Sequence, residues 1–218
     1  MGVLSDALEF PLAAGYVEGE EVDEIIQGRD GDCVWVIKSH LVSAYVLRQV
    51  RYGHVMGICT LRDPRDCVAS RLLFKPDESF CDAVSIVKGS YLCPMRLGDS
   101  SVLFIDYGAI MGDPMGVIQQ IMKYLGVNAS YEYKWQIASA MAGELSMERM
   151  KEISDVQEPD NIDPLYQLHE NHINGGVEGR ALREMTETQL TYCNRKLREE
   201  IDFFHVKQSQ PAPSALYA

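Results

Sequence analysis

The chain has 218 residues, of which 46% are hydrophobic and 24% charged, the balance of a globular protein. Its 20 Lys and Arg residues stand against 32 Asp and Glu residues, so the formal net charge is -12. Binding to a nucleic-acid backbone needs concentrated cations, so this balance excludes a general nucleic-acid surface. The length favours a single domain, which we expect over residues 1–206, followed by a flexible tail at 207–218.

Short apolar runs alternate with helical patterns along the chain. The apolar runs predict strands over 33–37, 55–61 and 101–105. Helical periodicity predicts helices over 22–27, 40–52, 64–74, 80–92, 114–125, 131–141, 146–153 and 186–204. Residues 169–183 are too rich in glycine for a regular element. This alternation implies an α/β domain with a mostly parallel sheet flanked by helices.

Membrane, metal and compartment signals are weak. No stretch approaches the roughly 20 apolar residues that span a bilayer, and the first residues lack the basic start and apolar core of a signal peptide. The six cysteines form no CxxC pair and no Cys/His ligand spacing, so we expect no metal. Cys33, Cys59 and Cys67 lie in apolar segments and are interpreted as reduced, buried thiols, which favours the cytoplasm.

Polar residues follow the first two predicted strands, where a parallel sheet presents reactive side chains. Arg62 directly ends the second strand, and the next residues, Asp63 and Pro64, are typical of a helix start. A strand that leads into a helix N-terminus places backbone N–H groups and the positive end of the helix dipole beside Arg62. The junction therefore favours a bound phosphate, which Ser70 would reach only along the flank of the helix.

The cations Lys38, Arg62, Arg65 and Arg71 stand out on an acidic background and indicate a local anion site. Scattered surface charge explains Arg65 and Arg71 well, but it explains Arg62 less well, since Arg62 directly ends an apolar run. His40 follows Lys38 at the first strand end; an imidazole can take a proton from an attacking hydroxyl or amine, and an ammonium can stabilise charge on a transferred group. The alternative is a surface lysine beside a turn histidine.

Several segments resemble those of sulfotransferases that use 3′-phosphoadenosine 5′-phosphosulfate (PAPS). IKSH resembles the family's lysine-threonine-histidine strand end, and LRDPRDCVASRLLF resembles its 3′-phosphate-binding strand and helix. The intervals from His40 to Arg62 and from Arg62 to Ser70 are those of the family. Weaker similarity continues through FIDYGAIMGDPMGVIQQIMKYLGV, LSMERMK and GGVEGRALREMT. The resemblance implies a P-loop-kinase-like sulfotransferase fold, with PAPS as co-substrate.

The resemblance also implies roles for individual residues. His40 would deprotonate the acceptor, and Lys38 would neutralise the sulfuryl group during transfer. Arg62 and Ser70 would bind the 3′-phosphate, where the planar donors of an arginine suit a phosphate dianion. The remaining cofactor-binding residues would be Ser146 and Met147 near the adenine, and Gly176, Gly179 and Arg180 in the loop that closes over the 3′-phosphate.

The chain departs from the family pattern at several positions. The Pro-Lys-Ser-Gly-Thr-Thr-Trp loop that wraps the 5′-phosphosulfate, with its central strand, has no counterpart in residues 1–33. A fragment is the favoured explanation; a diverged loop and an inactive relative are the others. A missing central strand would leave backbone unpaired, so such a chain would be poorly stable or would pair with another chain. The other departures are Ser39 for threonine, Asn174-Gly175 for Arg-Lys, Ala181-Leu182 at the tryptophan position and Ile105 for tyrosine.

Two functions follow from these observations. The first is a sulfotransferase that moves a sulfuryl group from PAPS to a hydroxyl or amine of a small-molecule or glycan acceptor, without a metal. The second is an inactive or truncated sulfotransferase-like module that binds nucleotide or a partner. A P-loop kinase is disfavoured because the chain has no G-x-x-x-x-G-K-[ST]. The sequence leaves the acceptor and the oligomeric state open.

Overall fold

The structure is a computed structural model that describes residues 20–28, 37, 43–97, 102–127, 132, 135–136, 139, 149, 151–152 and 178–210. The chain divides into two compact units, one of residues 1–49 and 129–173, the other of residues 50–128 and 174–218. The prediction of a single domain over 1–206 stays a prediction. The predicted strand 33–37 and the predicted helices 131–141 and 146–153 lie largely outside the described residues.

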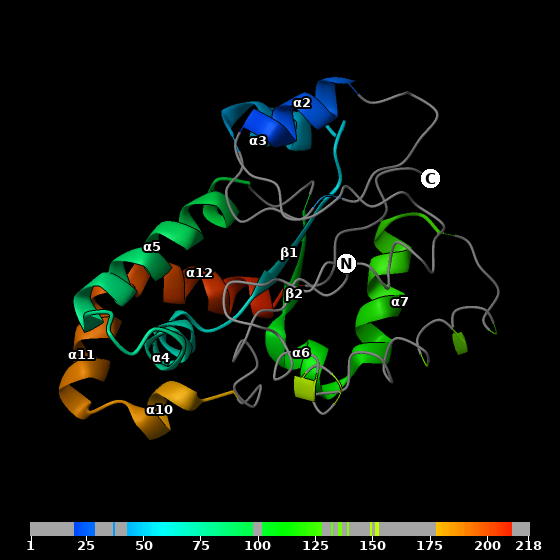
Figure 1. Ribbon diagram of the computed structural model, residues 1–218. Helices are drawn as coiled ribbons and strands as arrows, with labels where there is room; N and C mark the ends of the chain where they lie inside the picture. Colours follow the sequence, from blue (N-terminus) through cyan, green and yellow to red (C-terminus); the bar gives the residue numbers. More distant parts are fainter. Residues whose placement is uncertain are drawn as a thin grey trace. The chain divides into compact units, whose positions relative to one another are not determined.

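The second unit is built on two parallel strands, β1 (Gly57–Leu61) and β2 (Val102–Asp106). Their register runs from Gly57 opposite Val102 to Leu61 opposite Asp106. Parallel neighbours need a long crossover, which here contains α4 (Pro64–Phe74) and α5 (Phe80–Leu97). Helices α5 and α12 (Arg198–Gln208) lie on one side of the strands and α7 (Pro114–Tyr124) on the other (Figure 1). This arrangement confirms the predicted α/β class with a parallel sheet.

The alternating side chains of the strands pack into two apolar clusters. Cys59, Leu61 and Phe104 face the larger cluster, where Val68 of α4 is fully buried. Leu103 and Ile105 face the other cluster, with Val117 and Tyr124 of α7. The larger cluster also includes residues of α5, of α11 (Glu187–Lys196) and of α12, and the residue between the last two helices: Ala83, Val84, Val87, Tyr91, Cys193, Phe204 and Leu197.

Three helix boundaries confirm the sequence-based predictions. α4 begins at Pro64, and the Asp63 side chain accepts a hydrogen bond from the backbone N–H of Arg65. α7 ends before Gly126, whose φ of 69° lies in the left-handed region that favours glycine. α11 begins with a capping box, because the Thr186 hydroxyl accepts from the Gln189 N–H and the Gln189 side chain accepts from the Thr186 N–H.

The predicted helix over 40–52 begins too early. Ser43 is not helical, and its hydroxyl oxygen accepts from the backbone N–H groups of Tyr45 and Val46, at 3.1 and 3.2 Å. The same hydroxyl donates to Asp23 of α2 (Glu20–Gly28), at 2.6 Å. Helix α3 (Ala44–Arg51) therefore starts at a serine cap that the apolar periodicity did not reveal.

The predictions near the C-terminus need two further corrections. The predicted helix 186–204 is two helices, α11 and α12, because Leu197 between them adopts φ -108° and ψ 23°. At this break the Lys88 ammonium donates to the Lys196 carbonyl, at 3.2 Å. The region expected to be irregular contains α10 (Arg180–Glu184). In addition, α5 continues past Pro94 to Leu97, and α6 (Tyr107–Gly112) was not predicted.

The described cysteines are free thiols, as the sequence predicted for Cys59 and Cys67. Burial raises the pKa of each of these two thiols to about 12, so both are protonated near neutral pH and are weak nucleophiles. Cys33 lies outside the described residues. No described helix combines the length and the apolar character that crossing a bilayer requires.

Candidate functional site

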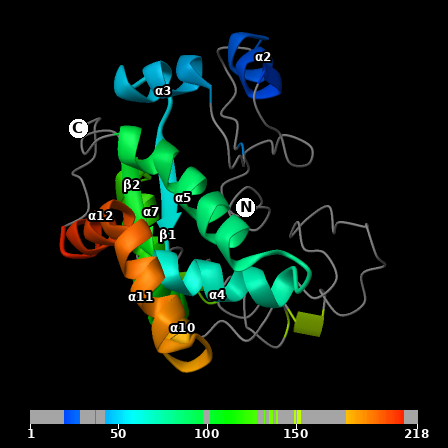
Figure 2. The ribbon, with the colours of Figure 1, turned by 90° about the vertical axis from the view of Figure 1, so that its left-hand side faces the viewer.

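The junction between β1 and α4 places Arg62 beside a helix N-terminus. β1 ends at Leu61 and α4 begins at Pro64, so Arg62 and Asp63 alone connect them. Pro64 suits the first helical position because it has no N–H to leave unpaired. The carboxyl ends of both strands point to the region of the unit that contains α4, α6 and α10 (Figures 1 and 2). An anion at this junction would meet the positive end of the α4 dipole and a guanidinium.

Two of the grouped cations are paired within the protein. The Arg65 guanidinium lies 2.5 Å from the Asp63 carboxylate, and the Arg71 guanidinium lies 2.5 Å from the Glu78 carboxylate. Burial alone would raise the pKa of Asp63, but the hydrogen bonds from Arg65 outweigh it and lower that pKa below its ordinary value. Arg65 and Arg71 therefore stabilise α4 locally. This agrees with the interpretation of these two residues as scattered surface charge.

We expect Asp63→Ala to destabilise the fold by about 1–2 kcal/mol, because it removes the cap of α4. Since the pKa of Asp63 is lowered from 3.8, its charge stabilises the fold above about pH 4 and less as the pH falls through its folded-state pKa. Asp63→Asn keeps an acceptor oxygen but cannot ionise. In urea unfolding, its deficit relative to the wild type should shrink from pH 7 to pH 3; a constant deficit would contradict the charge contribution.

Arg62 is held at its backbone and at its side chain. The Tyr91 hydroxyl of α5 donates to the Arg62 carbonyl, and Tyr91 is only 5% exposed. Burial raises the pKa of the Tyr91 hydroxyl, so it remains a donor at neutral pH. The Arg62 guanidinium lies over the ring of Tyr107, with Cζ 4.8 Å from the ring centroid. The contact from α5 thus holds the Arg62 backbone, and the contact with Tyr107, the first residue of α6, places its guanidinium.

A buried carboxylate joins α4 to the segment around Gly179. Asp66, in the first turn of α4, is 3% exposed. One of its oxygens accepts from the Gly179 N–H at 2.7 Å and the other from the Ala181 N–H at 2.9 Å. Gly179 has a φ of 68°, and the neighbouring Arg180 is 6% exposed and lies 3.7 Å from the Glu184 carboxylate. The structure thus brings Gly179 and Arg180 to the helix that follows Arg62.

Of the other predicted site residues, only Ser70 lies within the described part of the chain. Ser70 is a half-buried residue of α4, on the helix that Arg62 precedes. The predicted catalytic residues Lys38 and His40 lie outside the described residues. So do the three remaining cofactor-binding candidates: Ser146, Met147 and Gly176. Among the residues that the structure describes, no three His, Cys, Asp or Glu side chains could together hold a metal ion.

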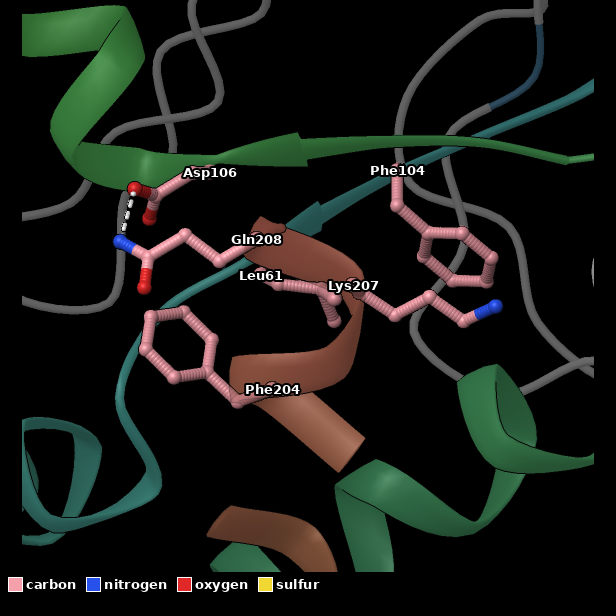
Figure 3. A pocket seen from close by; sticks show the side chains of 6 residues that line it. All are labelled: Leu61, Phe104, Asp106, Phe204, Lys207 and Gln208. Atoms are coloured by element: carbon pink, nitrogen blue, oxygen red, sulfur yellow. Dashed lines mark hydrogen bonds between the residues drawn. The ribbon is translucent and has the colours of Figure 1, made fainter. Parts of the chain in front are cut away.

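A shallow depression lies where β1 and β2 end (Figure 3). Leu61 and Asp106 line it from the strand ends, and Lys207 and Gln208 line it from α12, together with Phe104 and Phe204. Gln208 donates to Asp106 at 2.9 Å, and the Lys207 ammonium lies 4.9 Å from the ring centroid of Phe104. Its empty volume is about 180 Å³, including open solvent. Because ligand pockets span about 300–1,000 Å³, this depression alone is too small for a nucleotide.

Sequence reasoning missed three residues that organise the junction: Asp66, Tyr91 and Tyr107. Tyr107 follows β2 directly, as Arg62 follows β1, so the strand-end argument used for Arg62 could have found it. Asp66 and Tyr91 gave no such signal. An acidic residue in a first helical turn needs no distant partner, because the helix dipole already favours it, and Tyr91 lies within the predicted helix 80–92, whose periodicity indicates no hydrogen-bond partner.

Residues 27–202 match the family model described as "Sulfotransferase domain". The chain belongs to this family. Membership assigns it a sulfotransferase, and hence a transferase, activity. No curated protein matches the chain.

Two solved structures share the fold of this sulfotransferase-family chain. Mouse sulfotransferase SULT7A1 complexed with PAP is 18% identical with a TM-score of 0.60, over 94% of this chain and 81% of that one. Retinol dehydratase in complex with androsterone and inactive cofactor PAP is 17% identical with a TM-score of 0.56, over 82% of this chain and 56% of that one. The predicted sulfotransferase fold is thereby confirmed.

Proposed function

We propose that the chain binds PAPS at the β1–α4 junction and transfers its sulfuryl group to a hydroxyl or amine of a small molecule. The observation that carries this proposal is Arg62, which leaves a parallel strand directly before an Asp63-capped helix. A phosphate there meets a helix N-terminus and a guanidinium whose planar fork of donors matches it. Gly179 and Arg180, joined to α4 through Asp66, provide a second side for this phosphate site.

The nucleotides in the two similar structures support the proposed ligand. Both hold PAP, the adenosine 3′,5′-bisphosphate that remains when PAPS has given up its sulfuryl group. The androsterone in one of them supports a small-molecule acceptor over a glycan. The free thiols Cys59, Cys67 and Cys193 support a cytoplasmic location, because the cytosol keeps thiols reduced.

The proposed transfer depends on position and charge. His40 takes the proton of the acceptor hydroxyl or amine while the oxygen or nitrogen of the acceptor forms a bond to sulfur. The bond from sulfur to the bridging oxygen of PAPS breaks, and PAP leaves with that electron pair. Lys38 neutralises the charge on the moving group. Arg62, Ser70, Gly176, Gly179 and Arg180 hold the 3′-phosphate, and Ser146 and Met147 lie near the adenine. The proposal requires no metal.

Sulfuryl transfer from ³⁵S-labelled PAPS tests the proposal. The purified chain should bind PAP in calorimetry and should label an acceptor in a panel of phenols, hydroxysteroids and amines, with a sugar panel as the glycan alternative. PAP binding without any labelled product would favour the non-catalytic nucleotide-binding module. A chain that neither binds PAP nor transfers the label would contradict both functions.

Tyr107 gives a test of the Arg62 side chain itself. We expect Tyr107→Ala to weaken PAP binding about three- to tenfold, because it removes a cation–π contact of about 0.5–2 kcal/mol that orients the guanidinium. Tyr107→Phe keeps the ring and should stay within about twofold of the wild type. Calorimetric titration with PAP measures both variants. Equal affinities for Tyr107→Ala and Tyr107→Phe would contradict an orienting role of the ring.

A further inference from the structure

Asp66 supplies hydrogen-bond acceptors for N–H groups at the start of α10, where the preceding residue offers no side-chain acceptor. Helix N-terminal N–H groups need acceptors, commonly from the residue that precedes the helix. Gly179 precedes α10 and has no side chain to cap it. Asp66 of α4 accepts instead from Gly179 and Ala181, across 113 and 115 residues of sequence. The cap of α10 therefore comes from the first turn of α4, the helix that follows Arg62.

Both oxygens of the Asp66 carboxylate accept hydrogen bonds, and few other groups could replace their backbone donors. Asp66 is 3% exposed, so water cannot readily replace its partners, and a buried carboxylate without donors is costly. The bonded amides belong to Gly179 and Ala181, so Arg180 lies between two fixed points and is itself 6% exposed. α10 and α4 also lie close together in the view of Figure 2. Breaking the Asp66 hydrogen bonds would release Gly179 and Arg180 together.

We propose that Asp66 is a positioning residue, which holds Gly179 and Arg180 against α4 so that they and Arg62 act on one phosphate. This role rests on the proposed function, because Asp66 would position Gly179 and Arg180, the second side of the proposed phosphate site. Asp66 itself does not contact the nucleotide. Its contribution is the free energy that would otherwise be spent in ordering the Gly179–Ala181 segment when PAP binds.

Asp66→Asn is the central variant, because it keeps the size of the side chain. An amide has one acceptor oxygen, and its NH₂ group would face a backbone N–H, so one hydrogen bond is lost. We expect faster hydrogen exchange at Gly179 and Ala181, and PAP binding at least about fivefold weaker. The KM for PAPS should rise while kcat at saturating PAPS stays near the wild-type value.

Asp82→Asn is the matched control. Asp82 is also a first-turn carboxylate, but it belongs to α5, is exposed, and bonds to the nearby Ser79 hydroxyl. This variant should change neither the exchange at Gly179 and Ala181 nor the affinity for PAP. Faster exchange in Asp66→Asn with unchanged PAP affinity would overturn the proposal, because the contact would then be structural only. Unchanged exchange would overturn it as well.

A measurement on the wild-type chain covers the case in which Asp66→Asn does not fold. If docking of the segment and nucleotide binding are coupled, saturating PAP must slow hydrogen exchange at Gly179 and Ala181. Exchange at these amides that PAP leaves unchanged would overturn the proposal. Failure of the proposed function looks different: the wild-type chain would bind no PAP, and the positioning role would fall with it.

Discussion

Arg62→Ala should weaken PAP binding by about 100-fold. Hydrogen bonds to charged groups contribute about 1.5–3 kcal/mol each, and an arginine can make two to one phosphate. The loss of about 3 kcal/mol corresponds to roughly two orders of magnitude in affinity. Calorimetric titration with PAP measures this change. The Arg62 backbone is held by Tyr91 through its carbonyl, which the substitution keeps, so the fold should persist.

Arg71→Ala is the control for Arg62→Ala. Arg71 lies on α4 and pairs with Glu78, so its loss removes a cation near the same helix without touching the junction. Its PAP affinity should stay within about threefold of the wild type, because the Arg71 guanidinium donates hydrogen bonds to both carboxylate oxygens of Glu78 and, in the described part of the chain, none to the junction. Arg62→Lys should be intermediate, because it keeps the charge but loses the planar fork. Similar PAP affinities for Arg62→Ala and Arg71→Ala would contradict the assignment of the junction as the phosphate site.

The sequence predicted the β1–α4 junction well because its determinants are local. A β-branched apolar run, the Asp63 cap and Pro64 at the helix start are consecutive in the chain, and each restricts the backbone by itself. The same holds at the predicted helix boundaries near 125 and 186, where Gly126 follows α7 and where Thr186 and Gln189 form a capping box. Local signals of this kind agree with the fold wherever distant contacts do not compete with them.

The missed features depend on partners far along the chain. Leu197 interrupts a helical period that continues on both sides of it, and Lys88 of α5 binds the carbonyl of Lys196 at that break. Asp66 and Gly179 are 113 positions apart in the chain, and no sequence pattern indicates their contact. At these positions contacts with residues far along the chain determine the structure, so the local sequence pattern does not predict it.

The nucleotide site at the junction and the predicted catalytic pair, Lys38 and His40, give separable experimental signals, and this separation is the basis of the second large prediction. His40→Ala should lower kcat for sulfuryl transfer by about 10²–10⁴-fold, the usual contribution of a general base. Its affinity for PAP should stay within about twofold of the wild type, because the acceptor proton is not part of the nucleotide. Single-turnover transfer of ³⁵S from saturating PAPS measures the chemical step directly.

His54→Ala serves as the histidine control, because His54 is exposed and lies after α3, before β1 begins. It should leave both the transfer rate and PAP binding unchanged. Together with Arg62→Ala, these variants form a crossed design: Arg62→Ala loses binding, whereas His40→Ala keeps binding and loses transfer. Full activity of His40→Ala would refute the general base, while the nucleotide site at Arg62 would stand. Loss of PAP binding in His40→Ala would instead mean that His40 supports the nucleotide, so that transfer would need another base.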